Sequence, residues 1–486
     1  MLNKMGIKVS SKRIQGFLGH WPIVILLGTF LGISTLVIFI FGSDLVPYLL
    51  LALVFPFVLF LSGSPQKVLI FLILLDIPLQ LDISLGYIWQ LEYTGTINGY
   101  IVSLTTICLV VLYLIWGLEL ITKKTYGAHA LKFPDANLTL YLAVACFSII
   151  IAGLRRVASY ELFMLIQIFL LYYYLINNVK DRENLVLIIA ALMVGLVFEC
   201  IIIFLIRVLG QGFSIPGIVA SVYGASESTE GANRIAGTLS SANSAASYLC
   251  LLIVPAFSLI FTNLSMRYKL LGGLAAVLGS LALLLTGSRG GWLAAFLSLF
   301  IFCVISIRKG WLNIKVLILI GLIGLSILAV FSKPIFDRIF GDDAASAASR
   351  IPQYQFAWRI IRDHLIFGVG ANNYYFFQQQ YLSASPDNSV FRWAVHNKYL
   401  LVWAETGIFG LFFFLSFLIS TIKKGFNIQK TNDRLLAPVA LAMSAAVLGQ
   451  MVHMFFDVFH SRPQVQLLWV IAALLMVMTY LPQEKT

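Results

Sequence analysis

The chain has 486 residues, of which 60% are hydrophobic and only 11% are charged, and its formal net charge is +12. Ordinary soluble domains are about a quarter charged, so a mean hydropathy of +0.93 excludes a soluble globular protein. The strands of a membrane β-barrel would alternate apolar and polar residues, whereas the apolar runs here are continuous. The composition therefore predicts an all-α polytopic membrane protein, because a helix satisfies its own backbone hydrogen bonds inside lipid.

The apolar runs predict about 12–14 transmembrane helices, since a bilayer core of roughly 30 Å needs about 20 apolar residues per helix. We expect the spans near residues 22–42, 45–63, 67–83, 99–121, 138–154, 159–178, 183–208, 243–262, 268–287, 289–307, 312–331, 397–421, 434–456 and 464–482. The chain then divides into N-terminal membrane helices (1–230), a second helical group (231–331), one large loop with short helices (332–395) and C-terminal membrane helices (396–486).

Lysine and arginine predict the orientation of these helices, because they concentrate in cytoplasmic loops. The basic segments are the N-terminus, residues 122–132, 177–184, 265–269, 307–315 and 423–434, and the C-terminal tail. With fourteen spans they all fall on one side, so we expect both termini in the cytoplasm and the 332–395 loop in the periplasm. This topology explains the positive charge, so we expect membrane lipids and no nucleic acid as partners.

Four arginines depart from this pattern, because the same topology places Arg155, Arg156, Arg234 and Arg289 on the outer side. Arg289 lies in a short hairpin flanked by glycines, and an arginine at such a depth usually faces a cavity or a partner. The simpler alternative is that these side chains extend to lipid phosphates. A cavity with several guanidinium groups favours an anion such as pyrophosphate, which guanidinium binds in a bidentate manner.

His396 follows the large outer loop and begins an apolar helix. An imidazole at that position can accept a proton at neutral pH, and nearby arginines would favour its neutral, basic form. A base next to an anion clamp fits one reaction class, in which a sugar hydroxyl attacks an anomeric carbon and a lipid pyrophosphate leaves. The structural alternative is a helix-start histidine that bonds to a loop carbonyl.

Four motifs occur in order along the chain: "RIAGTLSSANSAASYL" from Arg234, "TGSRGGWLA" around Arg289, "SRIPQYQFAWRIIRDHLIFGVGANNYY" from Ser349, and "HNKYLLVWAETGIFGL" from His396. Together they resemble the O-antigen ligase superfamily, which also contains O-antigen and exopolysaccharide polymerases and protein O-oligosaccharyltransferases. The resemblance covers roughly residues 230–460. It implies a metal-independent glycosyltransferase of the bacterial inner membrane, with a periplasmic active site and an undecaprenyl-pyrophosphate-linked donor. It also implies that Arg234 and Arg289 bind pyrophosphate and that His396 is the catalytic histidine.

Other residues are weaker candidates for this site. Arg350 opens an amphipathic stretch whose apolar residues recur near helical spacing, at Ile351, Tyr354, Trp358, Ile361 and Leu365. Arg350 is either a third phosphate ligand or solvated, and Asn397 either orients the His396 ring or meets phosphate. No Cys/His cluster has zinc spacing and the pair Asp342–Asp343 stands alone, so we expect neither a metal nor a cofactor.

Three classes of function remain open on the sequence alone. The leading one is a transferase that moves a glycan from a lipid-linked donor to an acceptor, which is another glycan, a lipid A core or a protein. A flippase for lipid-linked oligosaccharides and a structural membrane protein are the alternatives. The grouping of polar residues at the outer edge, beside a large outer loop, favours the enzyme.

Overall fold

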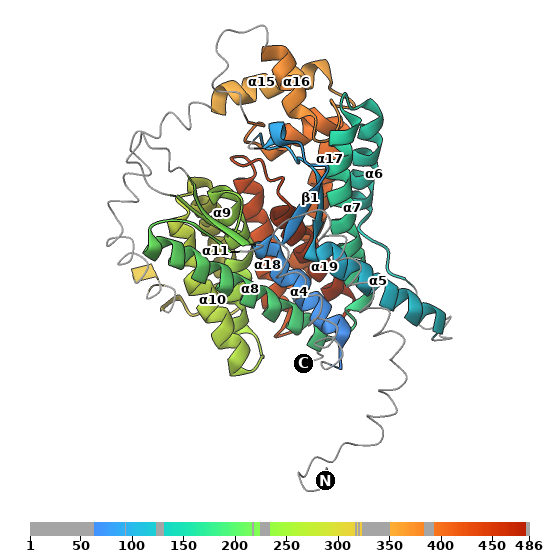
Figure 1. Ribbon diagram of the computed structural model, residues 1–486. Helices are drawn as coiled ribbons and strands as arrows, with labels where there is room; N and C mark the ends of the chain where they lie inside the picture. The colour runs from blue at the N-terminus through green and yellow to red at the C-terminus, as the bar shows by residue number, and fades with distance from the viewer. Residues whose placement is uncertain are drawn as a thin grey trace, which may run out of the picture.

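The computed structural model describes residues 63–322, except for 93, 123–130, 216–217, 224–233, 316–317 and 319–320, together with residues 350–382 and 393–482. Within these residues, nine helices are long and apolar enough to cross a membrane. A shorter apolar helix, α6 (Ala136–Ile151), packs against two of them. The protein is therefore an all-α polytopic membrane protein, as its composition predicts (Figure 1).

The elements of the first half alternate long helices with short strands. In chain order they are α4 (Pro65–Leu79), β1 (Asp82–Leu85), η2 (Trp89–Leu91), β2 (Tyr100–Ser103), α5 (Leu104–Thr122), α6, α7 (Arg155–Asn178), α8 (Arg182–Leu209), β3 (Phe213–Ile215), β4 (Ile218–Tyr223) and β5 (Arg234–Gly237). The strands form two small antiparallel sheets, β1–β2 and β3–β4–β5, in the connections between helices.

The second half is helical throughout its described residues. Its elements are α9 (Ala242–Ser258), η3 (Leu259–Phe261), α10 (Met266–Leu285), α11 (Arg289–Arg308), α15 (Arg350–Asp363), α16 (Tyr374–Leu382), α17 (Lys398–Ile428), α18 (Leu436–His453) and α19 (Arg462–Tyr480). Of the expected spans, 22–42 and 45–63 lie outside the described residues, apart from residue 63, and so does most of 312–331. The other eleven coincide with helices to within about five residues at most ends.

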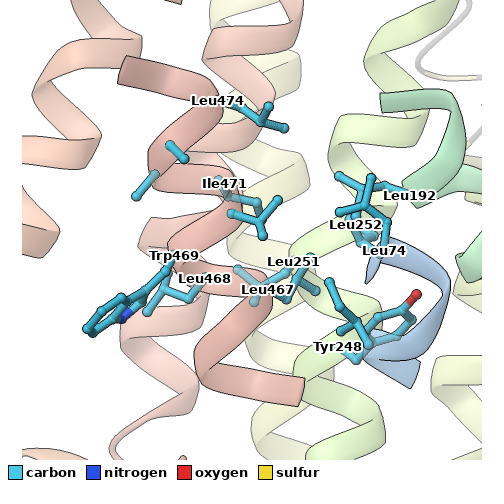
Figure 2. Close-up of a cluster of buried hydrophobic side chains, with 14 of the residues drawn as sticks. Leu74, Leu192, Tyr248, Leu251, Leu252, Leu467, Leu468, Trp469, Ile471 and Leu474 are labelled. Carbon is cyan, nitrogen blue, oxygen red and sulfur yellow. The ribbon is translucent and has the colours of Figure 1, made fainter. Parts of the chain in front are cut away.

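The core of the bundle lies where α9 and α19 meet α4 and α8. Leucines of these four helices interdigitate there, among them Leu74, Leu192, Leu252 and Leu467 (Figure 2). Trp469 of α19 is also buried, and its ring meets Phe417 of α17 at 6.1 Å between centroids. Both α9 and α19 are mostly buried, and most of their residues are apolar on every side of the helix. Polar residues such as Asn243 and Arg462 lie in their first turns.

Ion pairs join the expected cytoplasmic loops at one end of the bundle. Arg182 at the start of α8 pairs with Asp433 before α18, and Lys424 near the end of α17 pairs with Asp135 before α6. These contacts confirm that the basic segments around residues 177–184 and 423–434 share one end. The helices α7 and α17 end at these segments, so Arg155, at the start of α7, and His396, just before α17, lie at the opposite end.

Above this opposite end lie α15 and α16, both within the large loop (Figure 1). The turn after α15 packs against a kink in α17, where Gly407 has a φ of 70° and a Cβ would stand 2.0 Å from the Ile366 carbonyl oxygen. Only glycine permits that backbone and that approach. The N–H of Gly370 donates to the Glu405 carbonyl at 2.9 Å, which fixes the loop on α17.

Candidate functional site

A small polar pocket of about 30 Å³ lies at this end of the bundle, between α9, α11, α15 and α18. It is lined by Arg234, Asn243, Gly287, Ser288, Arg289, Gly290, Arg350, His453 and Phe456. Arg234, Arg289 and Arg350 are more than 50 residues apart in the chain, and the fold brings all three together. The enclosed space admits only about one or two water-sized spheres, so a larger anion could meet the arginines only at the mouth of the pocket.

Arg234 begins β5, and hydrogen bonds on both sides hold its guanidinium. Its Nε donates to the Thr286 carbonyl at 3.1 Å, and its Nη2 donates to Asn243 Oδ1 at 2.8 Å. The end of β5 is fixed by Glu199, a fully buried carboxylate of α8 that accepts from the Thr238 backbone N–H at 3.0 Å and from the Thr238 hydroxyl. Glu199 therefore positions the strand that presents Arg234.

Arg289 is the first residue of α11 and follows a tight turn. Gly287 adopts a φ of 60°, and the Ser288 side chain caps the helix by accepting from the Gly291 N–H. A Cβ on Gly290 would stand 3.0 Å from His453, and one on Gly291 would stand 2.7 Å from Ala246. The glycines thus let the start of α11 pack closely on α18 and α9, and the helix N-terminus adds its partial positive charge to the pocket.

Arg350 opens α15 and completes the pocket from above. Its guanidinium carbon lies 5.9 Å from the centroid of the Phe456 ring, a cation–π contact. Burial lowers the pKa of Arg350, and the positive charge of Arg289 lowers it further. This repulsion shows that like charges share the pocket, and an anion bound between them would relieve it.

His396 contacts α15 at Gln353, which lies one helical turn after the pocket residue Arg350. Gln353, three residues after Arg350 on that helix, accepts a hydrogen bond from the His396 backbone N–H at 3.4 Å through Oε1. The same oxygen lies 3.3 Å from His396 Nδ1. A backbone N–H only donates, so the facing amide atom is an oxygen, and its contact with the ring favours the tautomer that carries the proton on Nδ1. The lone pair is then on Nε2, which is the tautomer that a base needs.

The pKa of the His396 imidazole is lowered, mainly by burial and further by the charges of Arg350 and Arg234, while Asp457 opposes this shift. The neutral, basic form is thus favoured near neutral pH. His460, which also lies at this end, has its pKa lowered to about 4 by burial and by Lys398. His460 therefore stays neutral across the physiological range.

His453 is a pocket residue that the sequence analysis did not identify. It is buried at the end of α18, with Nε2 3.5 Å from the Ser288 hydroxyl and Nδ1 3.5 Å from Gln450 Nε2. The only sequence signal is a histidine at the end of an apolar run, in "GQMVHMFF". Such a residue usually packs in a core, so the signal by itself indicates no function.

Other predicted site residues lie away from the arginine pocket. Asn397 is the N-cap of α17, and its side-chain oxygen accepts from the Tyr399 and Leu400 N–H groups at 3.0 and 3.1 Å. Arg155 and Arg156 line a different cavity at the start of α7. The expected apolar stripe of α15 is also different from the buried one, because Ile351 and Trp358 are exposed whereas Phe356 and Ile360 are buried.

No group of three or more His, Cys, Asp or Glu side chains with metal-binding geometry occurs among the residues that the structure describes. The pocket itself has only cationic and neutral groups, which suits an anion better than a metal ion. Its chemistry is therefore that of an anion clamp next to a neutral imidazole.

Comparison with known proteins identifies the family of this region. The sequence model of a family described as O-antigen ligase matches residues 274–415. This part of the chain is therefore similar to O-antigen ligases. The matched range contains Arg289, Arg350 and His396, and it ends before His453 and begins after Arg234. It is shorter than the range over which the four motifs resemble the superfamily.

The O-antigen ligase match supports a glycan-transferring enzyme of the ligase or polymerase type at the level of the family. Together with the nine apolar helices, it indicates a multi-pass protein of the bacterial inner membrane. An uncharacterized protein of Haemophilus influenzae is 24% identical over 189 residues, covering 34% of this chain and 47% of the relative. The chain thus spans about half the length of the curated relative it matches.

Proposed function

We propose that this protein transfers a glycan from an undecaprenyl-pyrophosphate donor to an acceptor hydroxyl at the periplasmic end of the bundle. One observation carries the proposal. Three arginines surround one pocket, and Gln353, one turn further along α15, contacts His396 in the way that favours the tautomer of a base. The O-antigen ligase match, which covers Arg289, Arg350 and His396, supports the reaction class.

In this mechanism the pocket binds the donor pyrophosphate. Arg234, Arg289 and Arg350 compensate the negative charge that grows on the leaving group, together with the N-terminus of α11. His453 and Ser288 line the same pocket and can donate hydrogen bonds to phosphate oxygens. Because a carbonyl and an amide hold Arg234 and an aromatic ring holds Arg350, these two side chains need little reorganisation when charge develops.

The transfer is a single displacement at the anomeric carbon. The acceptor hydroxyl oxygen forms a bond to that carbon as the carbon–oxygen bond to pyrophosphate breaks, and the bonding pair leaves with undecaprenyl pyrophosphate. His396 Nε2 accepts the hydroxyl proton, and Gln353 stabilises the resulting imidazolium through Nδ1–H. The anomeric configuration is inverted. In this mechanism the chain's own residues supply the base and the groups that stabilise the leaving pyrophosphate.

The test uses proteoliposomes with a defined undecaprenyl-pyrophosphate glycan and three acceptors: a second lipid-linked glycan, a lipid A core and a Ser/Thr peptide. We expect transfer by the wild type, and a loss of at least about a hundredfold in His396→Ala and Arg289→Gln. Two variants are matched controls: His364→Ala, at the end of α15 with its ring against Phe377, and Arg359→Gln, on the exposed face of α15.

The productive acceptor identifies the polymerase, ligase or protein-transferase type. Full activity in His396→Ala would rule out the proposed base. Movement of the donor across the bilayer without transfer to any acceptor would instead indicate a flippase. Retention of the anomeric configuration in the product, measured by NMR, would contradict the single displacement.

A further inference from the structure

A second cavity, of about 810 Å³, opens at the start of α7 and is much larger than the arginine pocket. It is lined by Ile88, Gln90, Leu91, Ala152, Gly153, Leu154, Arg155, Arg156, Val157 and Phe376. They belong to η2 and the residue before it, to the α6–α7 turn and the first turn of α7, and to α16. In Figure 1, α7 and α16 stand apart from α9 and α11, which form the arginine pocket.

The cavity presents two adjacent guanidinium groups. Arg155 and Arg156 are both exposed. Arg156 is held in place, because its Nε donates to the Tyr160 hydroxyl at 2.7 Å and its Nη2 donates to the Gly86 carbonyl at 3.2 Å. An arginine that merely extends to bulk lipid phosphates needs no such anchor, whereas a fixed guanidinium presents its fork in one direction.

The surroundings of these arginines match an amphiphile with an anionic centre. On the α6 side, Ile150 and Leu154 are 64% and 43% exposed, as expected where a helix faces lipid tails. On the η2 side, Trp89 and Tyr87 are 70% and 46% exposed, and such aromatic faces stack on sugar rings. Exposed apolar and aromatic side chains thus adjoin the cavity in the chain on both sides of the arginines, as an amphiphile with an anionic centre would require.

One short segment connects this cavity with His396. Its first part, from Ile88 to Leu91, lines the cavity. Six residues after Ile88, the Thr94 carbonyl accepts a hydrogen bond from the Ala394 N–H at 2.8 Å, two residues before His396. A Cβ on Gly95 would lie only 3.3 Å from the Ala394 Cβ. The segment that carries His396 is therefore joined by a backbone hydrogen bond to the segment that lines the second cavity, and the charges of Arg350 and Arg234 act on its imidazole from the other site.

From this arrangement we infer that the second cavity binds the acceptor as a phosphate-bearing, lipid-linked glycan, with Arg155 and Arg156 on its phosphate. The inference rests on the proposed function, and it gives a role to a second pair of arginines outside the arginine pocket. The donor pyrophosphate occupies one side and the acceptor lipid the other, so the acceptor hydroxyl and the anomeric carbon meet at His396. The acceptor phosphate belongs either to an undecaprenyl pyrophosphate or to a lipid A core.

The first experiment counts bound lipids by native mass spectrometry of the full chain with undecaprenyl pyrophosphate. We expect two bound copies for the wild type, and one each for Arg155→Gln/Arg156→Gln and for Arg289→Gln. Arg207→Gln is the matched control, because Arg207 is an exposed arginine at the end of α8, on the same end of the bundle as the start of α7. Two bound copies in the double variant would overturn the inference. It would also be overturned if the wild type retained phosphatidylglycerol at this site as well as it retains undecaprenyl pyrophosphate.

The second experiment measures transfer to one acceptor glycan carried on three lipids: undecaprenyl pyrophosphate, a phosphorylated lipid A core and a neutral lipid. We expect the wild type to prefer one of the phosphorylated lipids, which identifies the source of the phosphate. In Arg155→Gln/Arg156→Gln the preference over the neutral lipid, as a ratio of kcat/KM, falls about tenfold, while the KM of the donor changes less than twofold. General damage to the fold would lower kcat/KM equally for the phosphorylated and the neutral acceptor lipids and would leave their ratio unchanged. An unchanged ratio would therefore refute the acceptor site.

The two experiments separate this inference from the proposed function. No transfer by the wild type to any acceptor would refute the proposed function, and the acceptor role with it. Transfer by the wild type with an unchanged preference in the double variant would refute the second site alone. The number of bound lipids reports on the second site independently of catalysis.

Discussion

Gln353 offers the sharpest test of the proposed base, because its oxygen faces His396 Nδ1 at 3.3 Å. Replacing it by glutamate keeps the shape of the side chain and places a carboxylate next to the ring. An opposite charge at this range raises the pKa of a histidine by about 1–3 units. In the wild type this pKa is lowered from its usual 6.5, mainly by burial and then by Arg350 and Arg234.

The base acts in its neutral form, so activity is present above the pKa of His396 and is lost as the pH falls through it. The acidic limb of the wild-type profile of kcat/KM should thus lie below about 6.5. In Gln353→Glu we expect this limb to move upward by at least about one pH unit. One unit below the shifted midpoint, the variant retains about a tenth of its plateau rate.

Gln353→Leu separates the charge from the hydrogen bond. It removes an acceptor worth about 1 kcal/mol, so we expect about a fivefold lower kcat/KM at the plateau and no upward movement of the limb. The assay is glycan transfer in proteoliposomes between pH 5 and 9. Gln355→Glu is the matched control, because Gln355 is exposed on the same helix and gains the same charge. An acidic limb that moves no further in Gln353→Glu than in Gln355→Glu would refute the assignment of His396 as the base.

Two further variants test how the arginine pocket is built. Glu199→Ala removes the acceptor that fixes Thr238, so we expect the KM of the donor to rise about tenfold through a displaced Arg234, with Glu199→Gln restoring most of the affinity. An unchanged KM would show that β5 holds its place without this contact. Gly290→Ala puts a Cβ 3.0 Å from His453, and such overpacking costs about 1–3 kcal/mol, measurable as a lower Tm and lower transfer. Gly117→Ala, whose Cβ would meet nothing within 4 Å, should change neither; equal effects of the two variants would contradict the close approach.

The helices could be predicted from the sequence because their signal is local. A continuous apolar run determines a span whatever its neighbours are, and so the eleven spans within the described residues were found to within a few residues at most ends. The strands β1 to β5 escaped prediction, because each has only three to six residues and pairs within a connection. Their role is positional: β5 presents Arg234, although nothing in its four residues distinguishes it from a loop.

The contacts of the site depend on tertiary packing, which a single sequence does not encode locally. The sequence indicated that Arg289 and its glycines approach something closely, but the partners, His453 and Ala246, lie on other helices. Arg350 was predicted as a phosphate ligand or a solvated residue, and the structure brings it into the pocket with Arg289. Asn397 shows the opposite case, since helix capping occupies its side-chain oxygen.

The chemistry gathers at helix starts for a physical reason. Arg155, Arg289, Arg350 and Arg462 are each the first residue of a helix at the same end of the bundle. A charged side chain in the middle of a span costs a few kcal/mol, whereas at the first turn it reaches the polar boundary. These positions are therefore where a membrane protein can place a cation at the polar boundary, within reach of an anionic group. The exception supports the rule: Arg462 is 4% exposed and pairs with Asp76 and Asp82, so its charge is already compensated and it is excluded as a phosphate ligand.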